Sequence, residues 1–325
     1  MKANISRLNR LLSAIGFAAV QVGAREGFTR ELAPIAGAID AVAFEADKVE
    51  AALLSEEARS DSEGYRTLRI LPLAIASSGG QATLNLYRDR SWSSLQSADA
   101  TLAKHYARGA LFALEDSMQV DAVTLDDAVA SANIANARYL RISGTAAPLD
   151  VLRSGPNLID GLCAIRARIL FAPLYKNQPL FADIDAELRT RGFRLASLDN
   201  LQTWRRGTEA PPDRWSGGAT PISAGQPIAA DALYLRPAED LLANTAAEQD
   251  RLIAHALIAF AHGHLDTTGA VLLRPPVRQR VLELCAIDVA VLLHDLGRWH
   301  ARRRRRQIGA ALAKQLGIYL RLSGR

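Results

Sequence analysis

The distribution of apolar residues predicts a chain in which short strands and helices alternate. Residues 4–15 carry apolar side chains at helical spacing, which predicts a first helix. Short apolar runs and amphipathic segments follow it in turn. They predict strands at 17–22, 38–45 and 68–76 and helices at 28–35 and 47–54. This order is typical of a parallel sheet with helices on both faces.

The same alternation continues to about residue 236. Residues 82–87 are expected to pair back on 68–76 as a hairpin. Further strands are expected at 119–124, 138–142, 163–171 and 192–198, and further helices at 102–115, from 125, at 148–152 and at 179–191. Arg166 and Arg168 interrupt the alternation of an otherwise apolar strand.

A change in composition divides the chain. Residues 205–227 are rich in Gly, Pro and polar residues and predict a long loop or linker. After a short apolar piece at 232–235, the pattern is helical from Pro237 onward, with an interruption at Pro275-Pro276. We therefore expect an α/β domain over 1–236, with 1–15 as its leading helix, and a helical extension over 237–325.

The first predicted strand ends in a glycine turn. The stretch from Ala18 to Gly27 reads AAVQVGAREG, and a helix is expected behind it. Glycines let the backbone approach a ligand closely, and a helix N-terminus offers unpaired N–H groups, so this turn suits a nucleotide-like ligand. Glu45, at the end of the second strand, would accept both ribose hydroxyls of an adenosine-containing cofactor, or it would cap the next helix.

The order of these motifs resembles the FkbM-type methyltransferases, which use S-adenosylmethionine. The matching positions are Val22, Gly23, Ala24 and Gly27 in the glycine turn, Glu45, the Ser93-Ser94-Leu95 loop, Thr124-Leu125-Asp126, the stretch YLRISGTAAPLDVLRSG, Phe171–Phe181 and Arg191–Phe193. The match covers roughly residues 15–236. It implies a Rossmann-like class I methyltransferase fold with a mostly parallel seven-stranded sheet, followed by the α-helical extension.

The resemblance also implies a site. It places the cofactor, S-adenosylmethionine, against Gln21, Gly23, Ala24, Gly27 and Glu45. It implies methyl transfer to a small-molecule or glycan acceptor, a sugar hydroxyl by analogy with the family. On the acceptor side it suggests Asp126, Arg141 and Ser143 as catalytic residues.

Several acidic positions of the family pattern are changed. Gln21, Ser143, Pro148 and Arg168 stand where the family usually has an acid, and Thr145-Ala146 replaces its Gln-Gly. A hydroxyl acceptor usually needs a base to take its proton, and Ser143 cannot be that base at neutral pH. The alternative is therefore a catalytically degenerate relative that acts as a scaffold through its helical C-terminus.

The charge of the chain is concentrated at its end. The net charge is +5, yet nine cations follow Leu296 and no Asp or Glu follows Asp295, which leaves −4 for the rest. The arginine run Arg302–Arg306 precedes an apolar face at helical spacing, formed by Ile308, Ala311, Leu312, Leu316, Tyr319 and Leu322. Such a basic amphipathic helix is solvated, docks on a protein partner, or lies on an anionic membrane. We do not expect nucleic acid as a partner, because aromatic residues are not interleaved with the arginines.

Two further features bound the class. The two cysteines lie in apolar runs and predict free thiols in a reducing cytoplasm, and no apolar run reaches the roughly 18 residues of a membrane span. We expect a cytoplasmic protein, peripheral at the inner membrane face if the basic helix binds lipid. His294-Asp295 with Gly297 resembles the HD phosphohydrolases, but the downstream Asp is missing. We therefore expect no resident metal and interpret His262 and His264 as helix-end residues.

Overall fold

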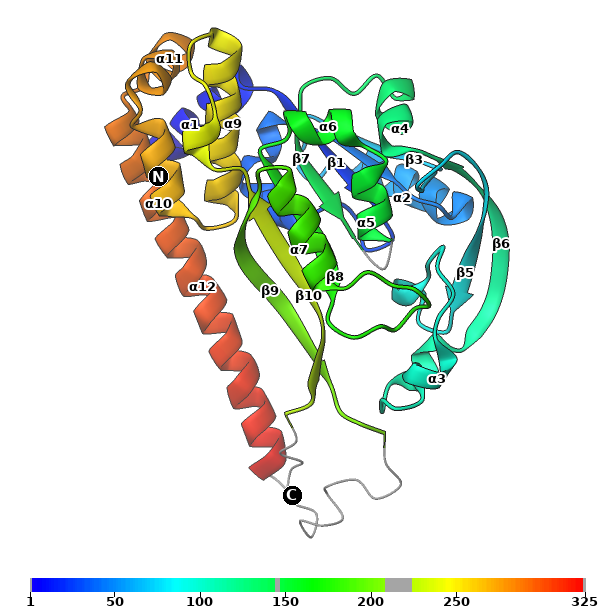
Figure 1. Cartoon of the computed structure of the whole chain (residues 1–325). Coiled ribbons are helices and arrows are strands. Elements are labelled where there is room, and N and C mark those ends of the chain that lie inside the picture. The colour runs from blue at the N-terminus through cyan, green and yellow to red at the C-terminus, as the bar shows by residue number, and fades with distance from the viewer. Residues whose placement is uncertain (1, 144–146, 208–223, 324–325) are drawn as a thin grey trace. The chain divides into compact units, whose positions relative to one another are not determined.

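The chain folds into two compact units (Figure 1). The computed structural model describes residues 2–143, 147–207 and 224–323, with side chains for all of these except 2–6, 306–307 and 310–323. One unit spans Gly16–Asp240, and the other consists of Met1–Ile15 with Leu241–Arg325.

A seven-stranded sheet organises the first unit. Its strand order is β3-β2-β1-β7-β8-β10-β9, and β10 runs antiparallel to both neighbours while the other pairs through β8 are parallel. The strands are β1 (Phe17–Val22), β2 (Ile39–Phe44), β3 (Thr67–Leu71), β7 (Ala137–Ile142), β8 (Ala164–Leu170), β9 (Arg194–Trp204) and β10 (Gln226–Leu235). The sheet confirms the predicted α/β class and the Rossmann-like, mostly parallel architecture.

Alternate residues of the central strands form the main core on one sheet face. Val20, Leu140 and Ile165 are fully buried there. The helices that cover this face are α4 (Leu125–Ser131), α5 (Pro148–Arg153), α6 (Pro156–Gly161) and α7 (Phe181–Thr190). Both faces of these strands are buried, which explains why they appear in the sequence as nearly continuous apolar runs.

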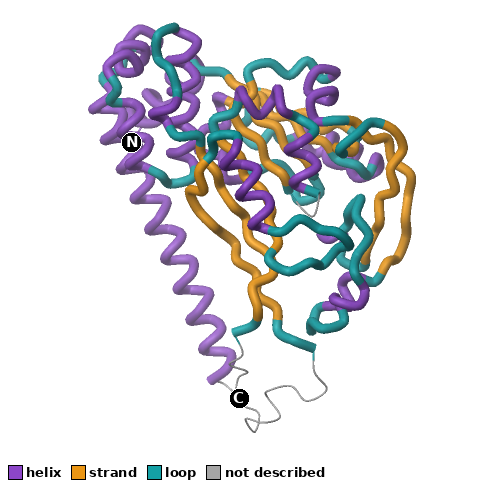
Figure 2. Tube along the Cα trace, viewed as in Figure 1, coloured by secondary structure: helices purple, strands orange, loops and turns teal. Residues whose placement is uncertain are grey.

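A second, three-stranded sheet has the order β4-β6-β5 (Figure 2). Its strands are β4 (Ala74–Ile75), β5 (Gly80–Tyr87) and β6 (Leu114–Val123). The predicted single strand at 68–76 is wrong, because the chain leaves the central sheet at Pro72, which has no N–H to donate to a ladder. The predicted hairpin is also wrong, since β5 pairs antiparallel with β6.

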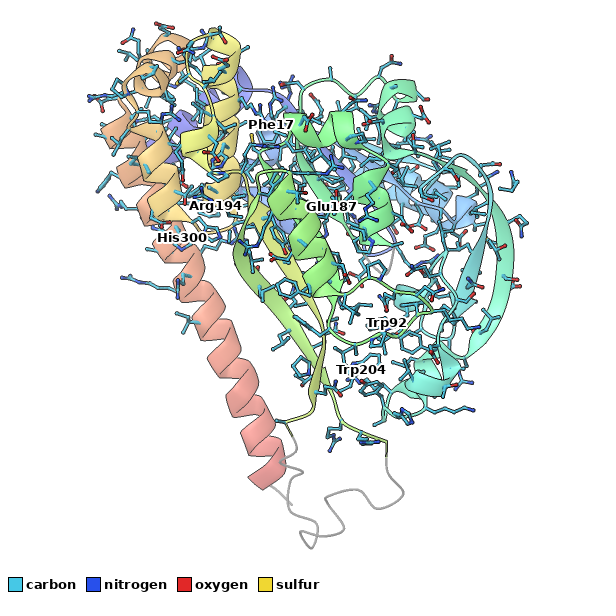
Figure 3. The ribbon with its side chains drawn as sticks, viewed as in Figure 1. Phe17, Trp92, Glu187, Arg194, Trp204 and His300 are labelled. Atoms are coloured by element: carbon cyan, nitrogen blue, oxygen red, sulfur yellow. The ribbon has the colours of Figure 1, made fainter. Side chains whose placement is uncertain are left out.

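The predicted helix at 102–115 is mostly replaced by other structure. Only α3 (Ala100–Ala103) and the 3-10 turn η3 (Gly109–Phe112) are helical before β6 begins at Leu114. An aromatic cluster holds this region, and Trp92 and Trp204 meet in it with ring centroids 5.1 Å apart (Figure 3). The hydroxyl of Tyr175 donates to the carbonyl of Trp92, which anchors the 3-10 turn η2 (Arg90–Trp92).

Three further elements differ in type or length from the prediction. The segment after the glycine turn is a 3-10 helix, η1 (Arg30–Ala38), with Pro34 inside it, rather than the helix expected at 28–35. The helix α2 (Lys48–Ser60) extends beyond the helix expected at 47–54. β10 is a ten-residue strand paired on both sides, with β8 and β9, and it begins within the expected 205–227 linker. Residues 208–223 of that linker lie outside the described residues.

The second unit is helical, as the pattern after Pro237 predicts. It contains α1 (Lys2–Ala14), α9 (Ala246–Ala261), α10 (Leu265–Leu272), α11 (Pro275–Cys285) and α12 (Val289–Ser323). The first helix therefore groups with the C-terminal helices and not with the α/β domain that we expected it to lead. Leu11 is fully buried, and Arg7 pairs with Asp295 of α12 at 2.9 Å. Helical periodicity identifies the buried face of such a helix but not its partner.

The length and hydropathy of the described helices decide whether any of them could span a bilayer. Among the residues that the structure describes, no helix combines the length and the apolar character needed to cross a membrane.

Candidate functional site

The glycine turn after β1 is stabilised by hydrogen bonds from the side chain of Gln21. Gly23 and Gly27 have φ values of +82° and +81°, in the left-handed region that favours glycine. The Gln21 amide Nε2 donates to the carbonyls of Gly23 and Gly27, both at 2.8 Å. Gln21 is therefore a buried residue whose side chain stabilises the turn and does not face a ligand.

Glu45 follows β2 and turns back to the glycine turn. Its carboxylate accepts from the backbone N–H groups of Ala24 at 2.9 Å and Asp47 at 3.2 Å. The N-cap of α2 is Asp47, whose side chain accepts from Val49 and Glu50, so Glu45 is not the cap. A carboxylate has about four lone-pair sites, and these two bonds leave part of its capacity for a ligand.

A pocket opens where β1, β2 and β7 end. Gly23, Glu45 and Ser143 line it, each at the carboxyl end of a different strand. It contains about 740 Å³ of empty space, part of it open to solvent. Its apolar lining consists of Val22, Phe44, Ala46, Leu73, Ala74, Ile75, Leu84 and Leu95. Ligands of parallel α/β sheets bind at this edge, as the sequence predicts.

Three charged residues of the pocket were not singled out from the sequence. Arg25 is neutralised by Asp47 at 3.0 Å and Glu50 at 3.3 Å, whereas Glu26 lines the pocket as an exposed side chain. Arg90, on η2, reaches the pocket from the loop that also supplies Ser91, Ser93 and Ser94. These positions lie in loops, where periodicity predicts nothing, and Glu26 stands inside the glycine motif that drew attention only to its glycines.

The guanidinium of Arg90 retains unused hydrogen-bond capacity. Its Nη2 lies 3.6 Å from Glu115, a long contact. Its Nη1 is buried and has no hydrogen-bond partner among the described residues. A buried N–H without an acceptor is unfavourable, so this group suits an anionic group of a ligand.

Ser143 is oriented by Arg141. The Arg141 Nε donates to the Ser143 hydroxyl at 2.8 Å, and its Nη1 lies 3.3 Å from Glu31 of η1. Since the serine oxygen accepts from Arg141, its own hydrogen remains available to donate into the pocket. Ser143 therefore presents a donor at the position where the resembling family has an acid.

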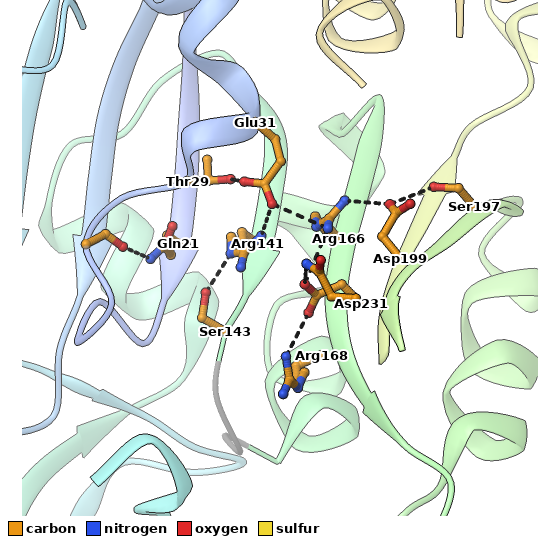
Figure 4. A network of polar contacts seen from close by, with 12 residues as sticks. Gln21, Thr29, Glu31, Arg141, Ser143, Arg166, Arg168, Ser197, Asp199 and Asp231 are labelled. Carbon is orange, nitrogen blue, oxygen red and sulfur yellow. Dashed lines mark hydrogen bonds and ion pairs between the residues drawn. The ribbon is translucent and has the colours of Figure 1, made fainter. Parts of the chain in front are cut away.

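Arg141 belongs to an ionic network on the sheet face opposite α4–α7 (Figure 4). Arg166, almost fully buried, lies 3.3 Å from both Glu31 and Asp231 and 3.0 Å from Asp199. Asp231 also pairs with Arg168 at 3.5 Å. The two arginines that interrupt the pattern of β8 are thus matched by acids from η1, β9 and β10.

The network sets the protonation of Glu31. Burial alone would raise the pKa of Glu31, but the Arg141 charge, the Thr29 hydroxyl and the Arg166 charge together lower it from 4.5 to about 2. Burial likewise opposes the charge of Arg166, yet Tyr139, Glu31, Asp231 and Asp199 raise the pKa of that guanidinium. Glu31 and Arg166 are therefore both ionised at neutral pH.

The remaining predicted site residues lie away from the pocket. Asp126 accepts from the backbone N–H groups of Asn157 and Leu158 and so caps α6. Ala24 and Gly27 shape the turn without lining the pocket, and Arg141 acts on it through Ser143. Thr145 and Ala146 lie outside the described residues.

Three histidines of the helical unit lie at helix ends or on the surface, whereas His255 is buried within α9. His262 and His264 stand at the C-cap of α9 and the N-cap of α10, and the His294 side chain is 67% exposed. Within the described part of the chain, no three His, Cys, Asp or Glu side chains converge as a metal site would require.

No protein-family model matches the sequence, and no curated protein matches it either. Distant structural similarity extends to solved methyltransferases. Magnesium protoporphyrin IX methyltransferase from Synechocystis PCC 6803, with bound S-adenosylmethionine, is 9% identical at a TM-score of 0.33, covering 72% of this chain and 78% of that one.

Two further solved structures are similarly distant. A putative tRNA (m1A22) methyltransferase of Streptococcus pneumoniae is 11% identical at a TM-score of 0.32, covering 86% of this chain and 98% of that one. TrmK of M. capricolum, in complex with S-adenosylhomocysteine, is 8% identical at a TM-score of 0.30, covering 91% and 96%. At these TM-scores the similarities assign no activity to this chain, and its fold class rests on the sheet order described above.

Proposed function

We propose that the chain binds S-adenosylmethionine in the pocket at the carboxyl ends of β1, β2 and β7 and is a methyltransferase. The observation that supports this most strongly is the meeting of Gly23, Glu45 and Ser143 in one pocket. They come from three strands of a sheet whose order and directions fit the class I methyltransferase fold.

The pocket offers complementary groups for each part of this cofactor. The free capacity of the Glu45 carboxylate suits ribose hydroxyls, and Ala46, Leu73 and Ile75 offer apolar surface for an adenine ring. Arg90, with a buried N–H that lacks an acceptor, suits the carboxylate of the methionine part. Gly23 has no side chain, and a Cβ built there would lie 3.0 Å from the carbonyl oxygen of Ser143.

The bound cofactor supplies an electrophilic methyl group, and the chain must bind, orient and deprotonate the acceptor. Ser143 donates a hydrogen bond, so it orients an acceptor atom and does not act as a base. Of the described residues that line the pocket, only Glu26 and Glu45 carry carboxylates, and Glu45 is engaged by two backbone N–H groups. We assign Glu26 as the proton acceptor. A sugar or glycan hydroxyl, which needs such a base, is the acceptor class we propose from the family resemblance.

The second candidate is a protein that binds the cofactor without turnover and acts as a scaffold. The observation that favours it is Ser143, which presents a hydroxyl held by Arg141 where the family pattern has a carboxylate. The substitution Ser143→Asp distinguishes the two candidates. A gain in methyl transfer shows an intact pocket that lacks only a carboxylate, whereas no transfer by either protein supports the scaffold.

Calorimetric titration with S-adenosylhomocysteine tests the binding claim. We expect one site with a micromolar dissociation constant. Glu45→Gln should weaken it about 10- to 100-fold, because a charge-assisted hydrogen bond contributes about 1.5–3 kcal/mol. Asp40→Asn, on the same strand but outside the pocket, is the matched control and should bind as the parent does. No heat at millimolar ligand would overturn the proposal.

A further inference from the structure

The first half of α12 carries a group of exposed arginines. Arg298, Arg302, Arg304 and Arg305 are exposed, and the last three make no ion pair among the described residues. Arg303 differs from them, since its guanidinium lies 5.4 Å from the Trp299 ring centre and its Nη1 donates to the carbonyl of Ala261. We call Arg298, Arg302, Arg304 and Arg305 the arginine surface.

Among the residues of α12 whose side chains are described, those at its beginning pack on the rest of the helical unit. Leu292 and Leu296 are buried, and the Trp299 ring packs on Phe260 with centroids 5.3 Å apart. The last described hydrogen bond from α12 to another helix of this unit is that of Arg303 to α9. Ile308, one turn further, is 52% exposed. The arginine surface therefore lies along the same stretch of α12 as its last described contacts with the unit.

The sequence beyond the arginines is predominantly apolar. Between Ile308 and Leu320 the only charged residue is Lys314. This run is too short to span a bilayer, which needs about 20 apolar residues. Its length and composition instead fit a helix that lies in the interface of a membrane, with cations at the level of the lipid phosphates.

We propose that the arginine surface and the following turns of α12 bind an anionic phospholipid surface. Guanidinium groups without acidic partners are complementary to lipid phosphates, which they bind in bidentate fashion. The exposed Ile308 and the apolar run behind it gain from burial at the acyl boundary. This binding is separate from the pocket of the α/β unit and does not depend on the proposed methyl transfer.

A membrane surface explains the observations better than nucleic acid does. Single-stranded nucleic acid is held by cationic grooves together with aromatic side chains on which bases stack. Trp299, the aromatic residue beside the arginines, is packed on Phe260 and covered by Arg303. Nucleic acid also offers no apolar phase for Ile308 and the residues that follow it.

Co-sedimentation of the full chain with lipid vesicles tests the proposal. We expect binding to vesicles of phosphatidylglycerol and phosphatidylcholine, much weaker binding to phosphatidylcholine alone, and a decrease in binding as salt rises. The triple variant R302Q/R304Q/R305Q should lose affinity on the order of 100-fold, since each cation near an anionic membrane contributes about fivefold. These side chains are exposed, so the variant should melt at the temperature of the parent.

Two control variants separate the surface from general charge. The variant R59Q/R88Q/R194Q removes the same charge from exposed positions of the α/β unit and should bind vesicles almost as the parent does. Ile308→Asp should weaken binding even at high salt, because it removes the apolar part. Equal losses for the two triple variants would overturn the proposal. So would no sedimentation with anionic vesicles, or a tight complex with a short RNA in place of the vesicles.

Discussion

At the residue scale, the site depends on a few side chains whose partners differ from those the sequence suggests. Gln21 has its amide donor committed to the glycine turn, and Glu45 is held by the backbone of Ala24 and Asp47. Ser143 is held as a donor by Arg141. The Nη1 of Arg90 is a buried cationic donor without a hydrogen-bond partner among the described residues, so Arg90 carries the most specific prediction about the ligand.

Arg90→Gln should remove the preference of the pocket for a ligand with a carboxylate. We expect the parent to bind S-adenosylhomocysteine about 10- to 100-fold more tightly than methylthioadenosine, which lacks the amino acid part, because a charged pair in a partly buried site contributes about 1.5–3 kcal/mol. In the variant the two ligands should bind about equally, as measured by calorimetry.

Arg88→Gln is the control for this comparison. Arg88 lies 3.7 Å from the same Glu115 but does not line the pocket, so its loss should keep the preference. Preference for the carboxylate ligand that survives in the Arg90 variant would contradict the assignment of Arg90.

Alanine substitutions at the two glycines of the turn are expected to have different effects on stability. Both have positive φ, but a Cβ at Gly23 would meet the Ser143 carbonyl oxygen at 3.0 Å, whereas a Cβ at Gly27 would meet nothing within 4 Å. Gly27→Ala should cost about 1 kcal/mol of unfolding free energy from backbone strain alone. Gly23→Ala should cost clearly more and should abolish binding of S-adenosylhomocysteine. Urea unfolding measures the loss of unfolding free energy in each variant. Equal losses in the two variants would contradict the close approach of β1 and β7.

At the element scale, the ionic network ties η1 to β7, β8, β9 and β10. Its members alternate with the core-facing residues of the strands, so one sheet face is apolar and part of the other is ionic. Isolated buried charges are costly, but each arginine here has an acid within 3.5 Å. The network holds Arg141 and through it Ser143, so it connects the sheet face to the pocket.

Acid should weaken the fold through Glu31. The folded-state pKa of Glu31 is about 2 against an ordinary value of 4.5, so its ionised form stabilises the fold above pH 4.5. This contribution, at most about 3 kcal/mol, is lost as the pH falls from 4.5 to 2. Unfolding free energies of the parent and Glu31→Gln should therefore converge over this range. In Glu57→Gln, which removes an exposed carboxylate of α2, the curve should parallel that of the parent. Parallel curves for Glu31→Gln as well would contradict the coupling.

The elements that the sequence predicts well are those whose pattern is set by burial on both faces. β1, β2, β7 and β8 appear as apolar runs in the sequence, and their positions were predicted from those runs. Sheet partners depend on contacts between distant residues, so the pairing of β5 with β6 and the place of β10 between β8 and β9 could not be derived from local pattern.

The candidate site shows the same division. Gly23 and Glu45 were predicted as site residues from the glycine turn and the end of the second strand, whereas Ser143 was predicted through the family resemblance. Arg90 was not, because it reaches the pocket from a loop that the aromatic cluster anchors. Asp126 matched a motif, but its carboxylate is used by the N-terminus of α6.

At the scale of the whole molecule, the chain combines an α/β unit with a ligand pocket and a helical unit that carries the arginine surface. Positive charge is concentrated at the end of the helical unit, because the nine cations that follow Leu296 exceed the net charge of +5 of the entire chain. Cofactor binding in the pocket and lipid binding by the arginine surface are therefore independent proposals. The ligand titrations test the first, and the vesicle experiments test the second.

The most direct test of the central claim is a crystal structure of the full chain grown with millimolar S-adenosylhomocysteine. The account predicts electron density for the nucleoside beside Gly23, with the ribose at the Glu45 carboxylate and the amino acid carboxylate at Arg90. Density for the nucleoside elsewhere on the chain, or an empty pocket at this ligand concentration, would contradict it.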